Sequence, residues 1–246
     1  YLIKASYVGS TTYQATEESV TLIVNPLRLV LMSALPGVPL FRFGGVNYTT
    51  DASGRVVIAV NSTGTYTVTV NSPISLATGT RAVFQQWADG WDSPSRSVIM
   101  DIDQTFTALM KRQFYLTTTS AYAAAEGSGW YDSNATAMFS VQPVADHGNR
   151  TRHVFTGWSG DIQVNETSGS IAMDSPKTIV ASWKKQFYVS VFTPHGTGRE
   201  EGWYDGGATA IINITPTTVD TGNGTRYVFA RWTGDLNATD PVASLV

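Results

Sequence analysis

The stretch Thr151-Arg152-His153-Val154-Phe155, followed by Trp158, occurs in two further copies along the chain. The other copies are Thr80-Arg81-Ala82-Val83-Phe84 with Trp87 and Thr225-Arg226-Tyr227-Val228-Phe229 with Trp232. Catalysis needs one unique constellation of groups, whereas a repeated constellation is typical of a stacked structural module. The repeat therefore predicts a spacer or a binding array and argues against an enzyme.

Two more motifs fix the period of the repeat. Gly129-Trp130-Tyr131-Asp132 returns 73 positions later as Gly202-Trp203-Tyr204-Asp205, and Gln113-Phe114-Tyr115 returns as Gln186-Phe187-Tyr188. A period of this length predicts several small domains in a chain of 246 residues. We expect a terminal segment over 1–25 and modules over 26–111, 112–185 and 186–246.

The pattern of apolar residues is that of β-strands. Val20, Leu22 and Val24 alternate with other residues, as do Tyr66 and Val68 further along. Alternation with a period of two marks a strand with one buried face. The chain has no long segment with helical periodicity, and the alanine-rich stretch 121–126 is too short for a helix. The sequence therefore predicts an all-β fold of tandem small β-sandwich modules in a rod.

Composition narrows the class of partners. The net charge is -3, only 14% of residues are charged, and cysteine is absent. Nucleic acid is a poor partner for a chain without a basic stripe, and disulfides and thiolate chemistry are excluded. We find no candidate transmembrane helix and no signal peptide. We therefore expect no membrane contact within this chain, with targeting and anchoring segments outside it.

Asparagine is concentrated in glycosylation sequons. Eight of the ten asparagines stand in Asn-x-Ser/Thr sequences, where roughly two would be expected by chance. These are Asn47, Asn61, Asn134, Asn149, Asn165, Asn213, Asn223 and Asn237. A sequon acquires its glycan outside the cytoplasm. Dense sequons without cysteine predict covalent N-glycans and an extracellular, archaeal cell-surface location.

Three stretches resemble known extracellular families. The later modules resemble divergent internalin B-repeat domains, with good coverage over 112–185 and partial coverage over 76–111 and 186–246. The matching residues are Gly129-Trp130-Tyr131-Asp132, Phe155-Thr156-Gly157-Trp158-Ser159-Gly160-Asp161 and the run from Met173 to Trp183. Tyr7-Val8-Gly9-Ser10 with Tyr13-Gln14-Ala15 resembles the closing hairpin of bacterial immunoglobulin-like domains. The front half of 26–111, including Gly44–Asp51, looks like the carboxypeptidase-regulatory type of β-sandwich. The resemblance implies β-rich modules in extracellular stalks, without catalytic residues.

The last module stops before the strand that completes the one before it. Lys177–Trp183 reads as a final strand, and the chain reaches Val246 without an equivalent. A missing strand leaves open backbone groups at a sheet edge. Two interpretations stay open. Either the chain is a fragment of a larger protein, or the N-terminal segment 1–25 of one subunit acts as a donor strand in the next subunit of a filament.

The tryptophans fall into two groups. Trp87, Trp158 and Trp232 recur at fixed spacing, which favours a core role over a sugar-stacking platform. Strict alternation from Arg152 would place Trp158 on one face of its strand and Phe155 on the other. Trp130 and Trp203 are the candidate glycan contacts, because each stands beside glycine at an exposed-looking turn.

Metal sites and catalytic sites have weaker support in the sequence. Asp101, Asp103, Asp132, Asp161, Asp205 and Asp235 make calcium a candidate ion, although capping of turns explains such residues more simply. The three histidines lack the converging ligands of a zinc site. No nucleophile elbow or glycosidase carboxylate pair is present. We therefore expect no catalytic residues, no resident metal and no cofactor beyond the glycans.

These observations predict a structural module string from a glycosylated S-layer, stalk or filament. Short linkers around Asn25-Pro26, Lys111-Arg112 and Lys184-Lys185 would join the modules, and the partners would be other copies or neighbouring surface proteins. Two alternatives remain: an adhesin-like module that grips polysaccharide, and a non-catalytic region of a larger secreted enzyme.

Overall fold

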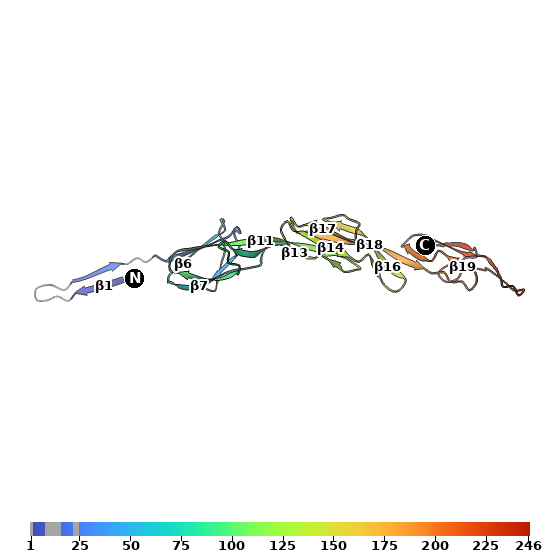
Figure 1. The fold of residues 1–246 in the computed structure, drawn as a ribbon, viewed down its shortest axis with the longest axis horizontal. Helices are drawn as coiled ribbons and strands as arrows, with labels where there is room; N and C mark the ends of the chain where they lie inside the picture. Colours follow the sequence, from blue (N-terminus) through green and yellow to red (C-terminus); the bar gives the residue numbers. More distant parts are fainter. Residues whose placement is uncertain (1, 8–15, 22–24) are drawn as a thin grey trace. The chain divides into compact units, whose positions relative to one another are not determined.

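The computed structural model describes residues 2–7, 16–21 and 25–246, with side chains from residue 25 onward. These residues form β-strands, turns and loops without an α-helix (Figure 1). The prediction of an all-β fold is therefore confirmed. No helix in these ranges could span a membrane. The chain divides into two compact units, 1–113 and 114–246, which are described separately.

Unit 1 begins with a pair of antiparallel strands. β1 (Leu2–Tyr7) pairs with β2 (Thr16–Thr21) over six residues each. The second strand starts earlier than the alternation at Val20 and Leu22 indicates. The hairpin resemblance at 8–15 and the alternating residues at 22–24 lie outside the described residues.

Two groups of strands build the rest of unit 1. One sheet has the order β10-β7-β4-β5, formed by β10 (Ser95–Met100), β7 (Gly64–Val70), β4 (Phe41–Phe43) and β5 (Val46–Tyr48). In the other, β3 (Leu27–Met32) lies between β6 (Arg55–Val60) and β11 (Gln104–Thr119), antiparallel to β6 and parallel to β11. β9 (Thr80–Trp87) pairs with β11 and with β8 (Ile74–Ala77).

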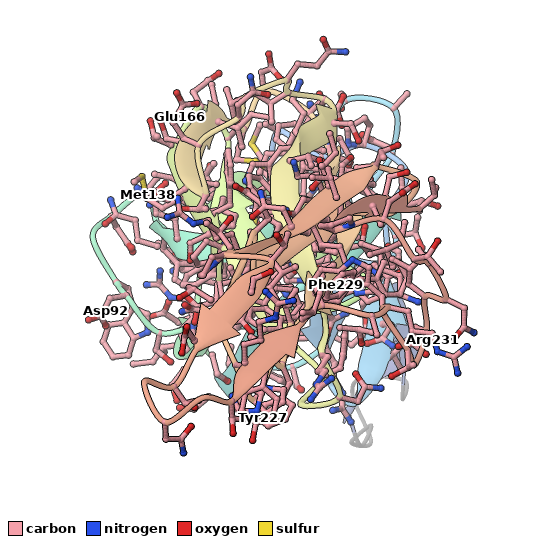
Figure 2. All side chains as sticks on the ribbon, turned by 90° about the vertical axis from the view of Figure 1, so that its right-hand side faces the viewer. Asp92, Met138, Glu166, Tyr227, Phe229 and Arg231 are labelled. Atoms are coloured by element: carbon pink, nitrogen blue, oxygen red, sulfur yellow. The ribbon has the colours of Figure 1, made fainter. Side chains whose placement is uncertain are left out.

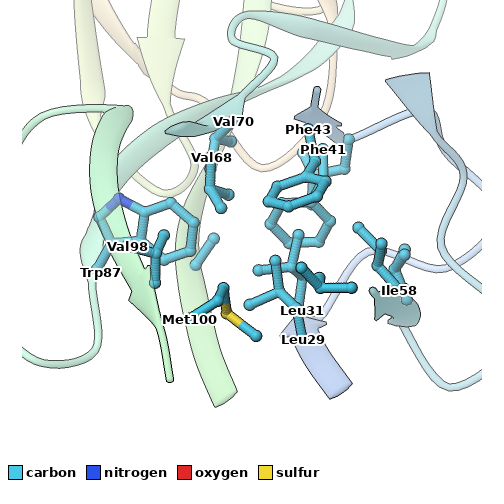
Figure 3. Packing of buried hydrophobic residues seen from close by; sticks show 14 residues of the cluster. Leu29, Leu31, Phe41, Phe43, Ile58, Val68, Val70, Trp87, Val98 and Met100 are labelled. Atoms are coloured by element: carbon cyan, nitrogen blue, oxygen red, sulfur yellow. The ribbon is translucent and has the colours of Figure 1, made fainter. Parts of the chain in front are cut away.

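The inward residues of both groups share one core. Alternate residues such as Leu29, Leu31 and Val68 are fully buried, because strand side chains point to opposite faces in turn. Trp87 is also fully buried, and its ring lies 6.3 Å from Phe41 between ring centroids. Figure 3 shows these side chains converging from both groups of strands. Trp87 thus anchors this core, as predicted.

Unit 2 contains two separate hydrophobic clusters. The middle cluster has Phe114, Leu116, Ala137, Phe139, Val141, Phe155, Trp158, Met173, Ile179 and Ala181. The C-terminal cluster has Ile212, Ile214 and Trp232, with Val189, Val191, Phe229, Leu236, Ala238, Ala243 and Leu245 packed against them. Trp158 and Trp232 are both buried, which confirms their predicted core role.

The middle cluster lies between two layers of strands. One layer is β12-β14-β17, formed by β12 (Ala125–Glu126), β14 (Thr136–Val141) and β17 (Ser168–Ala172). The other has the order β15-β16-β18-β11, with β15 (Val144–Asp146), β16 (Thr151–Gly160) and β18 (Lys177–Val189). β13 (Gly129–Asp132) pairs with β11.

The C-terminal part repeats the same strand pairings. Its sheet β19-β21-β24 consists of β19 (Thr197–Arg199), β21 (Ala210–Thr215) and β24 (Val242–Leu245). Glu126 opposite Ser140 in the middle part corresponds to Arg199 opposite Asn213, each 73 positions later. β22 (Thr218–Asp220) pairs with β23 (Arg226–Val228) in the register of β15 with β16. The sequence repeat is therefore a repeat of backbone pairing.

The predicted faces of β16 are wrong at Phe155. Its ring lies 5.7 Å from Trp158, and both residues are buried in the middle cluster. The register with β18 shifts between Phe155 and Gly157, so a β-bulge inserts one residue and reverses the alternation. Gly157 has a φ of 152°, and a Cβ there would come within 2.9 Å of the Asn165 Oδ1 atom. Glycine is therefore required at the bulge.

The predicted linkers at two junctions are also wrong. Lys184 and Lys185 lie inside β18, and Lys111 and Arg112 lie inside β11. In unit 2, β18 pairs with β16 from Ile179 to Phe187 and with β20 (Gly202–Asp205) from Gln186 to Val189. One continuous strand therefore serves both clusters, because ladder hydrogen bonds keep the lysine pair extended.

Candidate functional site

The sequon asparagines are distributed over turns and short strands of both units. Seven of the eight are exposed: Asn47, Asn61, Asn134, Asn149, Asn165, Asn223 and Asn237. Asn149 and Asn223 occupy equivalent turns, and in each the side-chain Oδ1 accepts a 2.5 Å hydrogen bond from a threonine hydroxyl. Accessible side chains on turns are suited to carry bulky, solvated glycans.

Asn213 differs from the other seven. It lies in β21, the central strand of its sheet, between Arg199 of β19 and Val242 of β24. The residue is half-buried, and its Oδ1 atom is buried without a hydrogen-bond partner. Unpaired buried carbonyl oxygens destabilise a fold by about 1–3 kcal/mol. The sequence pattern could not separate Asn213 from the exposed sequons, because the signature is the same.

Trp130 and Trp203 occupy equivalent positions in β13 and β20, and both are half-buried. Each ring makes an edge-to-face contact with the tyrosine of the repeated Gln-Phe-Tyr motif. The centroid distances are 5.2 Å for Tyr115–Trp130 and 5.3 Å for Tyr188–Trp203. The two tryptophans therefore pack against neighbouring strands of unit 2 as well as facing solvent.

A polar cluster surrounds Trp203 where the two halves of unit 2 meet. We call Arg152, Lys184, Gln186, Trp203 and Asp205 the junction cluster. The Arg152 guanidinium carbon lies 4.2 Å from the centroid of the Trp203 ring, and its Nε donates a 2.7 Å hydrogen bond to Gln186 Oε1. Gln186 Nε2 donates to one oxygen of Asp205 at 2.6 Å, and Lys184 Nζ to the other at 2.8 Å.

Asp205 is the one carboxylate in this cluster, beside the two cations Arg152 and Lys184. The pKa of Asp205 lies below its usual value. The hydrogen bond from Lys184 is the main cause, and the hydrogen bond from Gln186 is the second. The carboxylate thus stays charged at neutral pH and positions both donors. Arginine suits this site because its planar group can stack on an indole while its edge donates hydrogen bonds. The arrangement fixes the β18–β20 pairing and covers one face of Trp203.

Unit 1 carries part of the same pattern. Arg81 Nε donates a 2.8 Å hydrogen bond to Gln113 Oε1, matching Arg152 and Gln186. In the sequence these arginines and glutamines stand in separate motifs. Their contact could not be predicted there, because it depends on pairing between strands whose residues are 32 and 34 positions apart.

Stacked aromatic pairs form a second repeated feature. Tyr122 stacks on His153 with centroids 3.5 Å apart, and His195 stacks on Tyr227 at 3.7 Å. Tyr122 corresponds to His195 and His153 to Tyr227 in the repeat, so the two residue types are exchanged. The histidine itself is therefore not repeated at this position, whereas the stacked contact is.

His153 also contacts His147, whose Nε2 lies 2.8 Å from its Nδ1. The pKa of His153 lies below its usual value, mainly because the ring is partly buried. The neighbouring His147 and Lys185 lower it further. Among the described residues, no three His, Asp or Glu side chains gather as metal ligands. Two of the aspartates considered for calcium instead accept backbone hydrogen bonds: Asp103 from Arg28 N at 2.7 Å and Asp161 from Thr178 N at 2.6 Å.

Comparisons with protein-family models, with curated proteins and with solved structures give no match for this chain.

Proposed function

We propose that this chain is a structural string of tandem small β-sandwich modules from a glycosylated extracellular surface layer, stalk or filament. The proposal includes the absence of catalysis and of a resident cofactor. The observation that carries it is the repeated backbone pairing of unit 2, in which both halves share the single strand β18. Repetition with a shared strand serves extension, whereas chemistry would need one differentiated pocket.

The shared strand gives a physical account of this role. A load along β18 would be borne by its ladder with β16, from Ile179 to Phe187, and by its ladder with β20, from Gln186 to Val189. Pulling such ladders apart breaks several hydrogen bonds together. The junction cluster adds side-chain contacts at the point where a flexible linker would otherwise bend.

The sequons support the extracellular part of the proposal. Seven exposed asparagines occur across both units, and glycans there would shield sheet edges and loops. The stacking of Arg152 on Trp203 argues for a packing role at that position and disfavours the adhesin-like alternative.

Glycopeptide mass spectrometry on protein isolated from its native source tests the proposal. We expect glycan mass at most of the seven exposed asparagines and lower occupancy at Asn213. Asn25 and Asn71, which lie outside sequons, serve as internal controls. Bare asparagines throughout would refute the surface assignment.

A further inference from the structure

The turn between β22 and β23 carries a chemically reactive dipeptide. Asn223 is followed by Gly224, and no other asparagine of the chain stands directly before a glycine. Glycine has no side chain to shield its amide nitrogen, and its backbone is the least restricted of all residues. That nitrogen can therefore reach the side-chain carbonyl carbon of the preceding asparagine and close a cyclic imide. One asparagine thus belongs both to a glycosylation sequon and to this reactive dipeptide.

The turn leaves the attacking group unobstructed. Residues 221–228 are all exposed, and Figure 2 labels Tyr227 in this segment. A Cβ atom added to Gly224 would meet nothing within 4 Å. Gly224 lies outside the strands, and its amide donates no hydrogen bond to the described part of the chain. The nitrogen is therefore free to react with the neighbouring side chain.

The Asn223 side chain is held by hydrogen-bond donors. The Thr225 amide donates to Asn223 Oδ1 at 3.2 Å. The Thr221 hydroxyl donates to the same oxygen at 2.5 Å or to Thr225 O at 2.7 Å. Addition of a nucleophile to the side-chain carbonyl places negative charge on Oδ1, and donors already aimed at that oxygen stabilise the charge. The turn therefore favours the reaction at this carbonyl.

The middle part of unit 2 contains an equivalent turn with different chemistry. Both turns are closed by a backbone hydrogen bond between equivalent residues, of 3.1 Å in the middle part and 3.0 Å in the C-terminal part. Arg150, with a φ of 61°, stands where the other turn has Gly224, with a φ of 79°. Asn149 is exposed even though Tyr188 N donates to Arg150 O beside it. A strand next to such a turn therefore leaves the asparagine accessible.

We propose that Asn223 is a site of spontaneous deamidation in copies that carry no glycan there. The Gly224 nitrogen loses its proton and bonds to Asn223 Cγ, the bond from Cγ to Nδ2 breaks, and ammonia leaves. Water then opens the cyclic imide at either carbonyl, which gives aspartate or isoaspartate. The reaction consumes water alone. Its products lack the amide nitrogen to which an N-glycan is attached, so the sequon is lost.

A glycan on Asn223 protects the turn from this reaction. The substituted Nδ2 is a poorer leaving group than ammonia, and the sugar beside it hinders the approach of the Gly224 nitrogen. This protection rests on the proposed glycosylation, whereas conversion of the bare chain does not. The turn thus ends in one of two states, with a glycan or with a new carboxylate, and isoaspartate also lengthens the backbone between β22 and β23.

Peptide mapping of the unglycosylated 246-residue chain tests the conversion. After incubation, mass spectrometry with fragmentation that separates aspartate from isoaspartate should show Asn223 converting about tenfold faster than Asn149. Conversion should be faster at mildly alkaline than at neutral pH, because the attacking amide must lose a proton. Released ammonia should match the converted fraction. Equal rates at the two asparagines would refute the proposal.

Exchanging the residue after each asparagine is the matched control. Gly224→Arg should suppress conversion at Asn223, and Arg150→Gly should create fast conversion at Asn149. Both variants keep their sequons, and Arg150 itself shows that arginine fits this turn at positive φ. Circular dichroism checks that each variant is folded, and either variant tests the proposal without the other. Fast conversion that persists in Gly224→Arg would show that the glycine nitrogen is not the attacking group.

The same incubation of glycoprotein from the native source tests the protection. The Asn223 glycopeptide should persist with its sugar attached while the bare chain converts. Loss of the glycan at the rate of the bare chain would refute protection. Native protein with bare asparagines at every sequon would count against the surface assignment and would leave the conversion measured on the unglycosylated chain unaffected.

Discussion

At the scale of single residues, Trp203 decides between two roles for the repeated aromatic positions. One face of its ring lies under the Arg152 guanidinium, and its edge contacts Tyr188. A sugar platform needs a free face, whereas a packing residue needs these neighbours. The geometry favours packing, since arginine–indole contacts contribute about 0.5–2 kcal/mol.

We predict that Trp203→Ala destabilises the junction in unit 2. The side chain is half-buried, so a loss of about 2 kcal/mol is expected, below the 3–5 kcal/mol typical of a core tryptophan. Hydrogen exchange of the β18 and β20 amides should accelerate about 30-fold. Trp91→Ala, at a residue that is 51% exposed in unit 1, is the matched control. Unchanged exchange, together with lost binding to polysaccharide, would instead support the adhesin-like alternative.

His153 predicts a dependence of stability on pH. Its pKa is lowered in the folded chain by burial and by the neighbouring His147 and Lys185. The unfolded chain then binds more protons below about pH 6.5. Stability is therefore complete above that pH and declines as the pH falls through the lowered pKa of the folded state.

The measurement is the melting temperature of unit 2 at pH 7.5 and pH 5, which should be lower at pH 5. His153→Tyr supplies the residue found at the equivalent position 227, which stacks on His195. That variant should lose most of the difference between the two pH values. An equal shift in both proteins would show that His153 is not the responsible group.

At the scale of elements, β18 replaces the expected linker by a strand with neighbours at both ends. Lys184 pairs with Val154 and Lys185 with His153 in the ladder with β16. A protease must bind several residues in an extended, detached form, so paired residues are cut only after local opening.

We predict that trypsin spares Lys184 and Lys185 in the folded, unglycosylated protein. Arg150 should be cut first, because it is exposed in a turn and has a φ of 61°. Mass spectrometry of timed digests identifies the order of cleavage, and digestion in urea should cut all three sites. Early cleavage at the lysine pair would restore the linker interpretation.

At the scale of the whole molecule, the repeat of sequence is also a repeat of the way in which a core is completed. The same pattern of alternating residues completes unit 1 at Ala108 and the middle part of unit 2 at Ala181. This recurrence agrees with the proposed structural role of the modules.

Sequence alone was sufficient for the all-β class, because period-two alternation directly reports which strand face is buried. It also identified Trp87, Trp158 and Trp232 as core anchors, since recurrence at fixed spacing reflects recurrence of environment. The sequons were visible as a chemical signature, but their exposure and the exceptional place of Asn213 were not.

Tertiary structure decided the features that depend on pairing between distant residues. The bulge at Gly157 reverses the faces of β16, and no local alternation reveals where a register shifts. The lysine pair looks like a linker by composition, yet its backbone groups are satisfied by β16. The junction cluster likewise forms only when strand pairing brings Arg152 to Trp203. Side-chain alternation is a local property of the chain, whereas register and partnership arise only between segments.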